Sequence, residues 1–353
     1  MATETIEFWW ALRPRFKIGV ITLISLAFFL SSCLSAKEDP EPPRCFKVEY
    51  SFIQPWGDHY SDSYEQWVNE FEQHKNFGID QIVLQWTLWG TQIHSSPPTP
   101  QWFPTALRAA KKTGVKLWVG LHYDPQFIIK LKGNRVRTYL AQRSRESTAL
   151  AKALISQMEA LAFPADNFAG WYLSDEVDSK LLTNDFYYLF LSQYFLEVRQ
   201  NLQILRGVPV AVSAYTGGNG DKQNLAFLWN QFMTATGINV LFNQDGVGAK
   251  LQTLSQAGDY NLLLSNYATK YGWNIIPVVE LFNIKKSSNQ FQTVSASPRQ
   301  VIERMNEVEQ NRDNPVAVFS LSSHVLQSKS PYKAQLEDLF KDNTIICHDQ
   351  LPM

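Results

Sequence analysis

The chain has 353 residues, of which 45% are hydrophobic and 13% aromatic, and its formal net charge at neutral pH is −1. This length suits one large α/β domain or two smaller domains. The balanced charge argues against nucleic acid and against a membrane surface bound through basic residues, because both need an excess of Lys and Arg to displace counterions. The abundant aromatic residues fit a large core, and they also fit a carbohydrate cleft in which flat rings cover the faces of sugars.

The first 32 residues have the pattern of a secretory signal peptide. Three basic residues between positions 13 and 17 precede an apolar run over residues 18–30, which is shorter than the roughly 20 residues of a comfortable transmembrane helix. The sequence LSSC at residues 30–33 resembles a bacterial lipobox. That resemblance implies cleavage before Cys33 and lipidation of its thiol. An uncleaved anchor helix is the alternative.

The residues after the lipobox predict where the protein resides and where its globular part begins. The residue after the cysteine is Leu34 and not Asp. By the same resemblance, this implies sorting to the outer membrane of a Gram-negative cell. The barrel would then lie in the periplasm or at the cell surface, held to the membrane only by the lipid anchor. Residues 33–44 are charged and rich in proline and are typical of an extended tether. No second linker follows, so we expect one domain over residues 45–353.

Short β-branched or aromatic runs alternate with longer amphipathic segments throughout this domain. The expected strands are residues 46–53, 81–85, 116–121, 168–173, 208–213, 239–242, 274–279 and 316–321. The expected helices are residues 64–77, 104–113, 144–162, 185–205, 224–236, 249–267, 298–311 and 332–340. Because each strand is followed by a helix, the strands should be parallel, and eight such units close into an α/β fold of the (β/α)8 TIM barrel type.

A doubly wound open sheet is the structural alternative to the barrel. Such a sheet usually has a glycine-rich phosphate turn after its first strand, but here residues 54–57 read QPWG. The one glycine cluster, residues 216–220, lacks the lysine of a phosphate loop. The sequence therefore predicts a barrel with no nucleotide or other cofactor.

Polar and aromatic residues follow the expected strands, at the end of a barrel where active sites lie. We expect these residues to bind substrate: Gln54, Trp56, Gln85, Trp86, His122, Asp124, Asp175, Tyr215, Gln244 and Asp245. Carboxylates, amides and rings converge there, while serine–histidine pairs are scarce, and this combination suits sugar chemistry. A carbohydrate substrate or ligand is the expected partner.

Several of these residues have a second interpretation. Asp245 precedes a glycine and could cap a helix. Trp56, Trp86 and Trp89 could stack on sugars, or they could form a lid over the barrel. His122 and Asp124 have the spacing of part of a metal site, but no companion histidine pair occurs at helical spacing, so we expect no metal.

Two glutamates end motifs that resemble a known group of enzymes. Glu176 ends the stretch GWYLSDE and Glu280 ends IIPVVE. The pair resembles the retaining glycoside hydrolases whose acid/base follows strand four and whose nucleophile follows strand seven. Through GWYLSDE, the stretch NQDGVG at residues 243–248 and the pair Gln85-Trp86, the chain is more closely similar to the bacterial glycosidase-like barrels classed as domain of unknown function 4434.

This resemblance implies that Glu176 is the general acid and base and Glu280 the nucleophile in hydrolysis of an extracytoplasmic polysaccharide. Two carboxyls about 5 Å apart cannot both ionise freely, so one keeps a proton for the leaving oxygen while the other attacks. Many of those glycosidases have Asn before the strand-four Glu. Here that residue is Asp175, so recognition of the substrate 2-hydroxyl does not carry over.

Each assignment has an alternative. Glu280 could be a barrel-end acid paired with Lys or Arg, and Glu176 could belong to the cap region of the next helix. For the whole protein, the alternative is a lipoprotein whose barrel binds polysaccharide or an envelope partner without catalysis.

The remaining cysteines, Cys45 and Cys347, are expected to be neighbours at the N-terminal end of the barrel strands. Cys45 directly precedes the first strand, and Cys347 follows the last helix, which returns to that end. An oxidising compartment would allow a disulfide between them, which would close a loop of about 300 residues. Two unpaired buried thiols are the alternative.

Overall fold

The computed structural model describes residues 45–90, 100–215, 217, 220–285, 292–308, 315–341 and 346–347. The predicted signal peptide, the predicted lipidation site Cys33 and the predicted tether lie outside the described residues. In the part that is described, no helix combines the length and the apolar character needed to cross a membrane.

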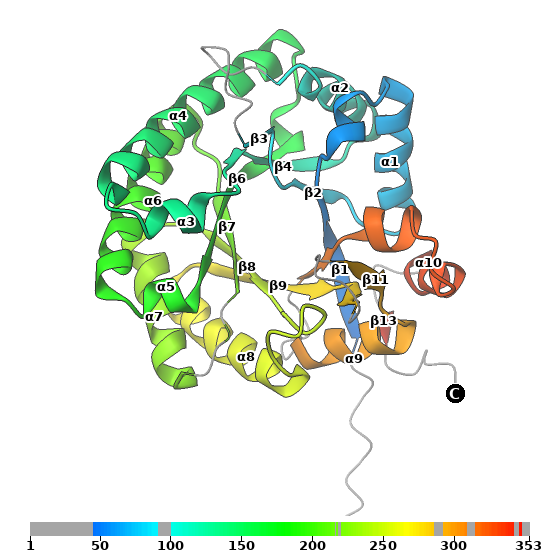
Figure 1. Ribbon diagram of the computed structural model, residues 1–353. Helices are drawn as coiled ribbons and strands as arrows, with labels where there is room; N and C mark the ends of the chain where they lie inside the picture. Colours follow the sequence, from blue (N-terminus) through cyan, green and yellow to red (C-terminus); the bar gives the residue numbers. More distant parts are fainter. Residues whose placement is uncertain are drawn as a thin grey trace, which may run out of the picture. The chain divides into compact units, whose positions relative to one another are not determined.

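The strands of the described residues form a closed parallel barrel surrounded by helices (Figure 1). In order around the ring they are β1 (Cys45–Ile53), β2 (Gln81–Leu84), β4 (Lys116–Gly120), β6 (Phe168–Asp178), β7 (Val210–Tyr215), β8 (Val240–Gln244), β9 (Asn274–Glu280) and β12 (Pro315–Phe319). Each pairs in parallel with the next, and β12 pairs with β1 to close the ring. The predicted (β/α)8 fold is confirmed.

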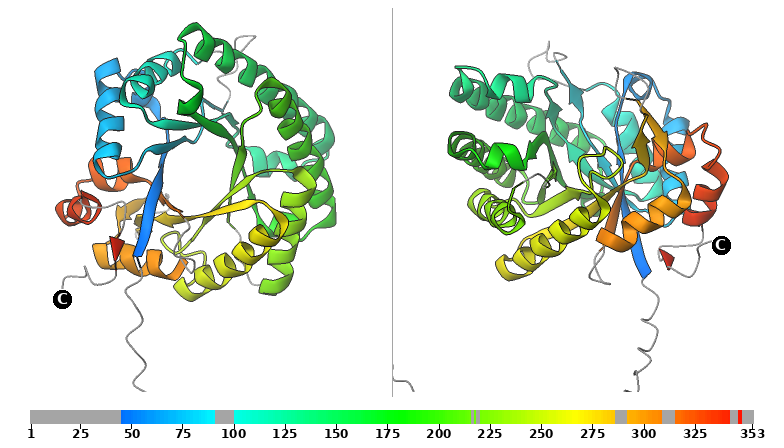
Figure 2. Two further views of the ribbon diagram at one scale, coloured as in Figure 1. Left: turned by 180° about the vertical axis from the view of Figure 1, so that it is seen from behind. Right: turned by 60° about the horizontal axis from the view of Figure 1, so that its bottom comes forward.

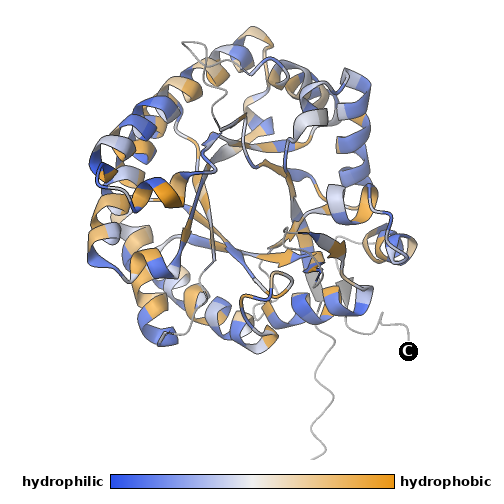
Figure 3. Cartoon of the chain, in the orientation of Figure 1, coloured by the Kyte–Doolittle hydropathy of each residue, from blue (hydrophilic) through white to orange (hydrophobic). Residues whose placement is uncertain are grey.

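The helices pack around the outside of this ring, as the reverse and tilted views also show (Figure 2). The long ones are α1 (Tyr64–Asn76), α2 (Phe103–Thr113), α4 (Val136–Ala160), α6 (Asp185–Leu205), α7 (Lys222–Thr236), α8 (Leu254–Tyr271), α9 (Pro298–Val308) and α10 (Lys333–Lys341). Short ones are α3 (Phe127–Leu131), α5 (Ser179–Leu182), the 3-10 turns η1 (Gly57–Tyr60) and η2 (Ala165–Asn167), and the π-helical turn η3 (Ser322–Leu326). Apolar and polar residues alternate around the helices (Figure 3), because one face of each packs on the strands.

The interior of the barrel is filled with aromatic side chains. Phe242 lies at the centre of this group, with its ring centroid 5.3 Å from that of Phe52, 5.6 Å from Tyr50 and 5.8 Å from Trp118. Tyr172 contacts Phe52 at 5.8 Å. These rings are buried and close the barrel, so any site must lie above them, where the strands end.

Three expected boundaries were wrong in ways that affect the mouth of the barrel. The fourth barrel strand does not end at residue 173 but continues to Asp178. The helix expected over residues 144–162 begins at Val136. The helix expected from residue 249 begins only at Leu254, where Thr253 forms a capping box with Gln256. Residues 245–253 are therefore a loop.

Two small strand pairs at the ends of barrel strands were not predicted. β3 (Leu88–Trp89) pairs in parallel with β5 (His122–Tyr123), and β10 (Phe282–Ile284) pairs antiparallel with β11 (Thr293–Ser295). Both pairs extend the wall of the barrel on its mouth side, because β3, β5 and β10 follow β2, β4 and β9 directly.

The first and last described strands bring the two cysteines together. β13 (Ile346–Cys347) pairs antiparallel with β1, and Cys45 lies opposite Cys347 in the register (Figure 1). Opposite Cα atoms in such a ladder are about 4.5–5.5 Å apart, which is within the range that a disulfide spans. The disulfide itself stays a prediction, and alkylation of the unreduced exported protein followed by mass spectrometry tests it.

Candidate functional site

Strand alternation aims a set of polar side chains into the barrel mouth. Successive side chains of a strand point to opposite faces, so the residue two positions beyond the last inward core side chain also points inward. Phe52, Val83, Tyr172, Phe242 and Val278 belong to the inner core. The residues two positions after them are Gln54, Gln85, Ser174, Gln244 and Glu280. Their position at the mouth follows from the strand pattern that also packs the core.

A cavity of about 160 Å³ opens among the ends of the strands β6, β7 and β8 and the segment that follows β4. The residues that line it are Tyr123, Asp124, Pro125, Phe127, Ile128, Asp175, Glu176, Val177, Asp178, Tyr215 and Gln244. The cavity is small beside the roughly 300–1,000 Å³ of pockets for drug-sized ligands. Its size suits one sugar ring better than several.

Glu176 is the carboxyl best placed for chemistry in this cavity. A chain of side-chain amides orients it: Gln85 Nε2 donates to Glu176 Oε1 at 3.3 Å, and Gln54 Nε2 donates to Gln85 Oε1 at 2.8 Å. The side chain is accessible to solvent from the mouth, while protein surrounds it on the other sides. That desolvation raises its pKa, although a hydrogen bond with Gln244 acts in the opposite direction. A carboxyl with a raised pKa can act as a general acid.

An aromatic wall formed by Trp56, Trp86, Trp89 and Tyr123 stands beside the cavity. The ring centroids of Trp56 and Trp89 are 4.5 Å apart, those of Trp86 and Trp89 4.7 Å, and Tyr123 stacks on Trp89 at 4.5 Å. Trp86 is buried, whereas Trp56 is 48% exposed. Trp56 also donates from Nε1 to Gln54 Oε1 at 3.2 Å, so the wall is joined to the amide chain that orients Glu176.

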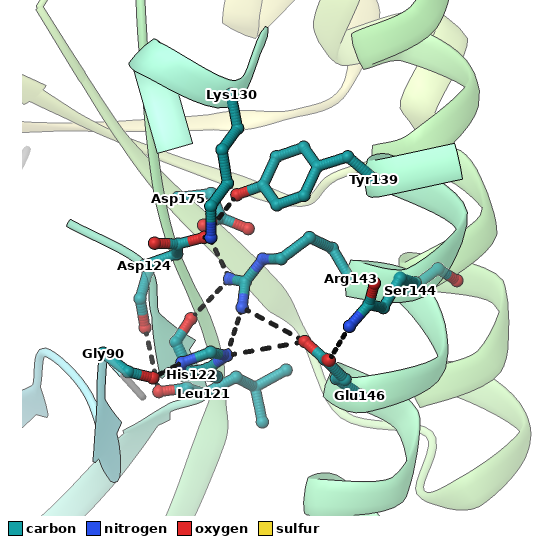
Figure 4. A network of polar contacts seen from close by, with 12 residues as sticks. Gly90, Leu121, His122, Asp124, Lys130, Tyr139, Arg143, Ser144, Glu146 and Asp175 are labelled. Atoms are coloured by element: carbon teal, nitrogen blue, oxygen red, sulfur yellow. Dashed lines mark hydrogen bonds and ion pairs between the residues drawn. The ribbon is translucent and has the colours of Figure 1, made fainter. Parts of the chain in front are cut away.

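The buried side chain of Arg143 joins His122 and Asp175, both of which are predicted to bind substrate (Figure 4). One guanidinium nitrogen of Arg143 donates to Asp175 Oδ1 at 2.7 Å and also to the His122 carbonyl. The other donates to His122 Nδ1, while His122 Nε2 donates to Gly90 O at 2.6 Å. Burial, and next the Arg143 charge, lower the pKa of His122 to about 4, so the imidazole is neutral.

The other oxygen of Asp175 is also occupied, because Tyr194 donates to its Oδ2 at 2.6 Å. Asp124 is held in the same manner: Lys130 Nζ and the Tyr139 hydroxyl both donate to its Oδ2 at 2.7 Å (Figure 4). Burial would raise the pKa of Asp124, but these hydrogen bonds outweigh it and lower the pKa. Asp124 and Asp175 border the cavity, yet their carboxylates brace the wall. Direct substrate binding by their carboxylates stays a prediction.

Glu280 does not line the cavity, and only 5% of its surface is exposed. Its Oε2 accepts a hydrogen bond from the backbone N–H of Ala249 at 2.8 Å. Burial, and next the repulsion of Asp245, raise the pKa of Glu280 to about 8. The same burial raises the pKa of Asp245 to about 6. The two acids thus form a buried, coupled pair in which Glu280 retains a proton near neutral pH.

The loop of residues 245–253 contacts Glu280 through Ala249, and Asp245 and Gly248 hold the loop against β9 and the residues that follow it. Asp245 accepts from Val247 N at 3.0 Å and from Glu280 N at 3.2 Å, so it braces the loop and is not the cap of α8. A Cβ on Gly248 would lie 2.1 Å from Phe282 O, which only glycine avoids. Arg304, buried on α9, donates to the carbonyls of Glu280 and Phe282.

The described structure therefore brings Glu176, Tyr215 and Gln244 to one cavity and leaves Glu280 outside its lining, beneath the loop that begins at Asp245. Sequence analysis missed Arg143, Tyr194 and Arg304. Arg143 had one signal, since it lies on the buried stripe of α4, where a charge needs a partner. The described residues contain no group of three or more His, Cys, Asp or Glu side chains that could hold a metal ion.

Comparison with known proteins gives a family and a fold. The family model described as "Domain of unknown function (DUF4434)" matches residues 48–335. A protein of Escherichia coli (strain K12), "Uncharacterized protein YbcH", is 29% identical over 195 residues, which are 55% of this chain and 64% of that protein. The match thus spans less than two thirds of that relative's length.

Two solved structures share the barrel. A protein of Bacteroides thetaiotaomicron VPI-5482, described as a "putative alpha-L-fucosidase", is 16% identical with a TM-score of 0.65 over 87% of this chain and 96% of the other. A glucosidase from Croceicoccus marinus is 8% identical with a TM-score of 0.50 over 87% of this chain and 69% of the other. At these identities the likeness is one of fold, and the fold is that of a glycosidase-like TIM barrel.

Proposed function

We propose that this chain, which belongs to the family described as domain of unknown function 4434, is a glycoside hydrolase. Its barrel carries an accessible carboxyl with a raised pKa in a cavity beside an aromatic wall. The observation that carries the proposal is Glu176, which the amides of Gln54 and Gln85 orient toward the cavity. In this proposal Glu176 protonates the leaving oxygen and later activates water.

The nucleophile in this proposal is Glu280, which would make the reaction retaining. Strand alternation aims it inward, but the loop of residues 245–253 covers it and its carboxyl faces Asp245. Attack on a sugar therefore requires that this loop shift and that Glu280 lose its proton. The raised pKa of Glu280 and the Ala249 contact are the features that substrate binding must change.

The substrate proposed is a polysaccharide outside the cytoplasm. Support comes from the signal-peptide pattern and the lipobox, and from rings of Trp56, Trp89 and Tyr123 that can cover sugar faces. The exported protein would be anchored by Cys33. The test is Cys33→Ser together with labelling by a radioactive fatty acid: the variant should fold, take up no label and leave the membrane fraction. Absence of label in the wild type would contradict the anchor.

The direct test of the enzymatic proposal is a screen of the purified, detergent-extracted protein against envelope polysaccharides and exopolysaccharides. New reducing ends should appear, and NMR of the first product should show the anomeric configuration of the substrate. Products of inverted configuration would overturn the role of Glu280.

A second function, binding without cleavage, is favoured by one observation: only Glu176 of the two glutamates lines the cavity. A barrel with this role would bind the polysaccharide on the same aromatic wall. Saturable binding of a glycan that the protein never cleaves would support this function.

A further inference from the structure

The cavity has a charge pattern that distinguishes among sugars. Of the described residues that line it, four are acids, namely Asp124, Asp175, Glu176 and Asp178, and none is Lys, Arg or His. The charge pattern bears on which sugar the site accepts.

Two of the four acids are neutralised by cations in the wall. Lys130 Nζ lies 2.7 Å from Asp124 Oδ2, and an Arg143 nitrogen lies 2.7 Å from Asp175 Oδ1. Arg143 is buried, and its guanidinium donates to Asp175 Oδ1. Each of these carboxylates thus has a positive partner and a tyrosine donor, and neither adds net charge to the cavity.

The other two acids, Glu176 and Asp178, have no such partner. Among the described residues, no Lys, Arg or His lies within salt-bridge distance of either carboxyl. Glu176 receives a neutral amide from Gln85, and Asp178 Oδ1 accepts the backbone N–H of Leu181 at 2.9 Å. Both residues belong to the end of β6 and line the same cavity.

From this pattern we infer that the cavity selects a cationic sugar, a hexosamine whose amino group is free, and that Asp178 is the carboxylate that recognises the ammonium. This inference rests on the proposed carbohydrate site and names its substrate class. An ammonium has three donors and a full charge, so it can satisfy the second oxygen of Asp178 and offset its charge. Anionic sugars such as uronates would be repelled, and an N-acetyl group would offer no charge.

Asp178 suits this role better than Glu176 does. Glu176 must carry a proton to act as an acid, and its raised pKa favours the protonated form. Asp178 lies beside it at the cavity wall and has one oxygen fixed by the N–H of Leu181, which orients the other. Recognition and proton transfer would then belong to two different carboxyls of one strand.

The test is calorimetric binding by the purified, detergent-extracted protein at about pH 6, where a sugar ammonium is charged. Three probes are compared: a tetramer of glucosamine, a tetramer of N-acetylglucosamine and a tetramer of galacturonic acid. We expect the glucosamine tetramer to bind at least about 10-fold more tightly than either of the others, with affinity that falls as salt increases. Equal binding of the first two, or failure of all three to bind, would overturn the inference.

Asp178→Asn provides the residue-level test, because Asn also caps helices and so keeps the contact to Leu181. The variant should lose most of the preference for glucosamine, while Asp166→Asn, which alters an exposed acid in η2, should keep it. An unchanged preference in Asp178→Asn overturns the assignment. If the variant does not fold, the salt dependence of the wild type still decides, since salt-independent binding contradicts ammonium recognition.

The same measurements separate this inference from the proposed hydrolysis. Selective binding of the glucosamine tetramer without cleavage of any glycan would support the cationic substrate class and contradict the enzymatic proposal. Cleavage of a neutral glycan, with no preference for free amino groups, would support hydrolysis and overturn the inference.

Discussion

Glu176 at the end of β6 and Glu280 at the end of β9 follow the inward-facing pattern of their strands, yet their surroundings differ. Glu176 lines the cavity and is held by the neutral amides of Gln54 and Gln85. Glu280 lies beneath a loop, against a second acid, and is nearly inaccessible. Strand alternation explains why both residues are at the mouth, and the adjacent loops explain the difference.

The end of β8 contributes to both environments. Gln244 hydrogen-bonds Glu176, and the next residue, Asp245, faces Glu280. β8 ends at Gln244, so the last strand residue supports the accessible Glu176 with an amide, and the first residue of the following loop places an acid beside the buried Glu280. Substitutions at Glu280 and Glu176 test whether the buried carboxyl takes part in the reaction together with the accessible one.

Glu280→Gln is the substitution with the largest expected effect. Gln keeps the shape and can still accept from Ala249 N, but it cannot attack an anomeric carbon, so turnover should fall by more than about 10⁴-fold while binding persists. Hydrolysis of a polysaccharide found in the screen measures this. Wild-type turnover in the variant would show that the covered carboxyl is structural and that another residue attacks.

Glu176→Gln should reduce turnover by about 10²–10⁴-fold, the range for loss of a general acid. In the wild type, activity should persist to a higher pH than an ordinary glutamate allows, because a raised pKa keeps the acid protonated. Glu72→Gln changes an exposed acid on α1 and serves as the control, so its pH–rate profile should coincide with that of the wild type. A wild-type alkaline limb at or below the ordinary glutamate pKa would contradict this role.

The buried acid pair predicts how stability varies with pH. The folded pKa values of about 8 for Glu280 and about 6 for Asp245 lie above the ordinary values of 4.5 and 3.8 for these side chains. The folded protein thus holds protons that the unfolded chain releases, so the free energy of unfolding should fall as pH rises from about 4 to about 8. At about 1.4 kcal/mol per pKa unit, the rise of the Glu280 pKa from 4.5 to about 8 corresponds to roughly 5 kcal/mol.

Urea unfolding of Glu280→Gln over the same pH range tests that sign. The variant cannot ionise at this position, so its stability should decline less between about pH 4 and pH 8 than that of the wild type. Parallel curves for the two proteins would mean that Glu280 is not protonated in the folded state.

All eight barrel strands could be located from the sequence, because each strand has its own local pattern of hydrophobic residues. The alternation of these strands with helices then predicts the barrel. Sequence analysis also placed Gln54, Gln85, Tyr215 and Gln244 at strand ends, since strand ends in a barrel share one face. It did not foresee which acids would be neutralised. Arg143 comes from the helix α4, and its distance from Asp175 depends on how α4 packs, which is a tertiary property.

The loop over Glu280 shows why local preference was misleading. Residues 249–252 read AKLQ, which are good helix formers, and the sequence therefore predicted a helix from Ala249. In the structure Ala249 donates its N–H to Glu280, and Lys250 has a φ of +57°, which a helix does not allow. Tertiary hydrogen bonds outweigh the helical propensity of four residues.

Trp56→Ala is the substitution with the smallest expected effect, and it tests the open side alone. Trp56 is 48% exposed, and the buried Trp86 supports the wall behind it, so the free energy of unfolding should change little. Loss of a stacking ring should weaken glycan binding by about 10-fold, with a smaller effect on the rate at saturating substrate.

Trp56→Phe keeps a ring but removes the hydrogen bond to Gln54 Oε1, so it separates the contribution of stacking from that of the hydrogen bond. Binding near wild type in Trp56→Phe and weakened binding in Trp56→Ala would assign the effect to stacking. If Trp56→Ala binds glycan as well as the wild type, the aromatic wall is a lid over the barrel, and the substrate contacts lie on the β6–β8 side of the cavity.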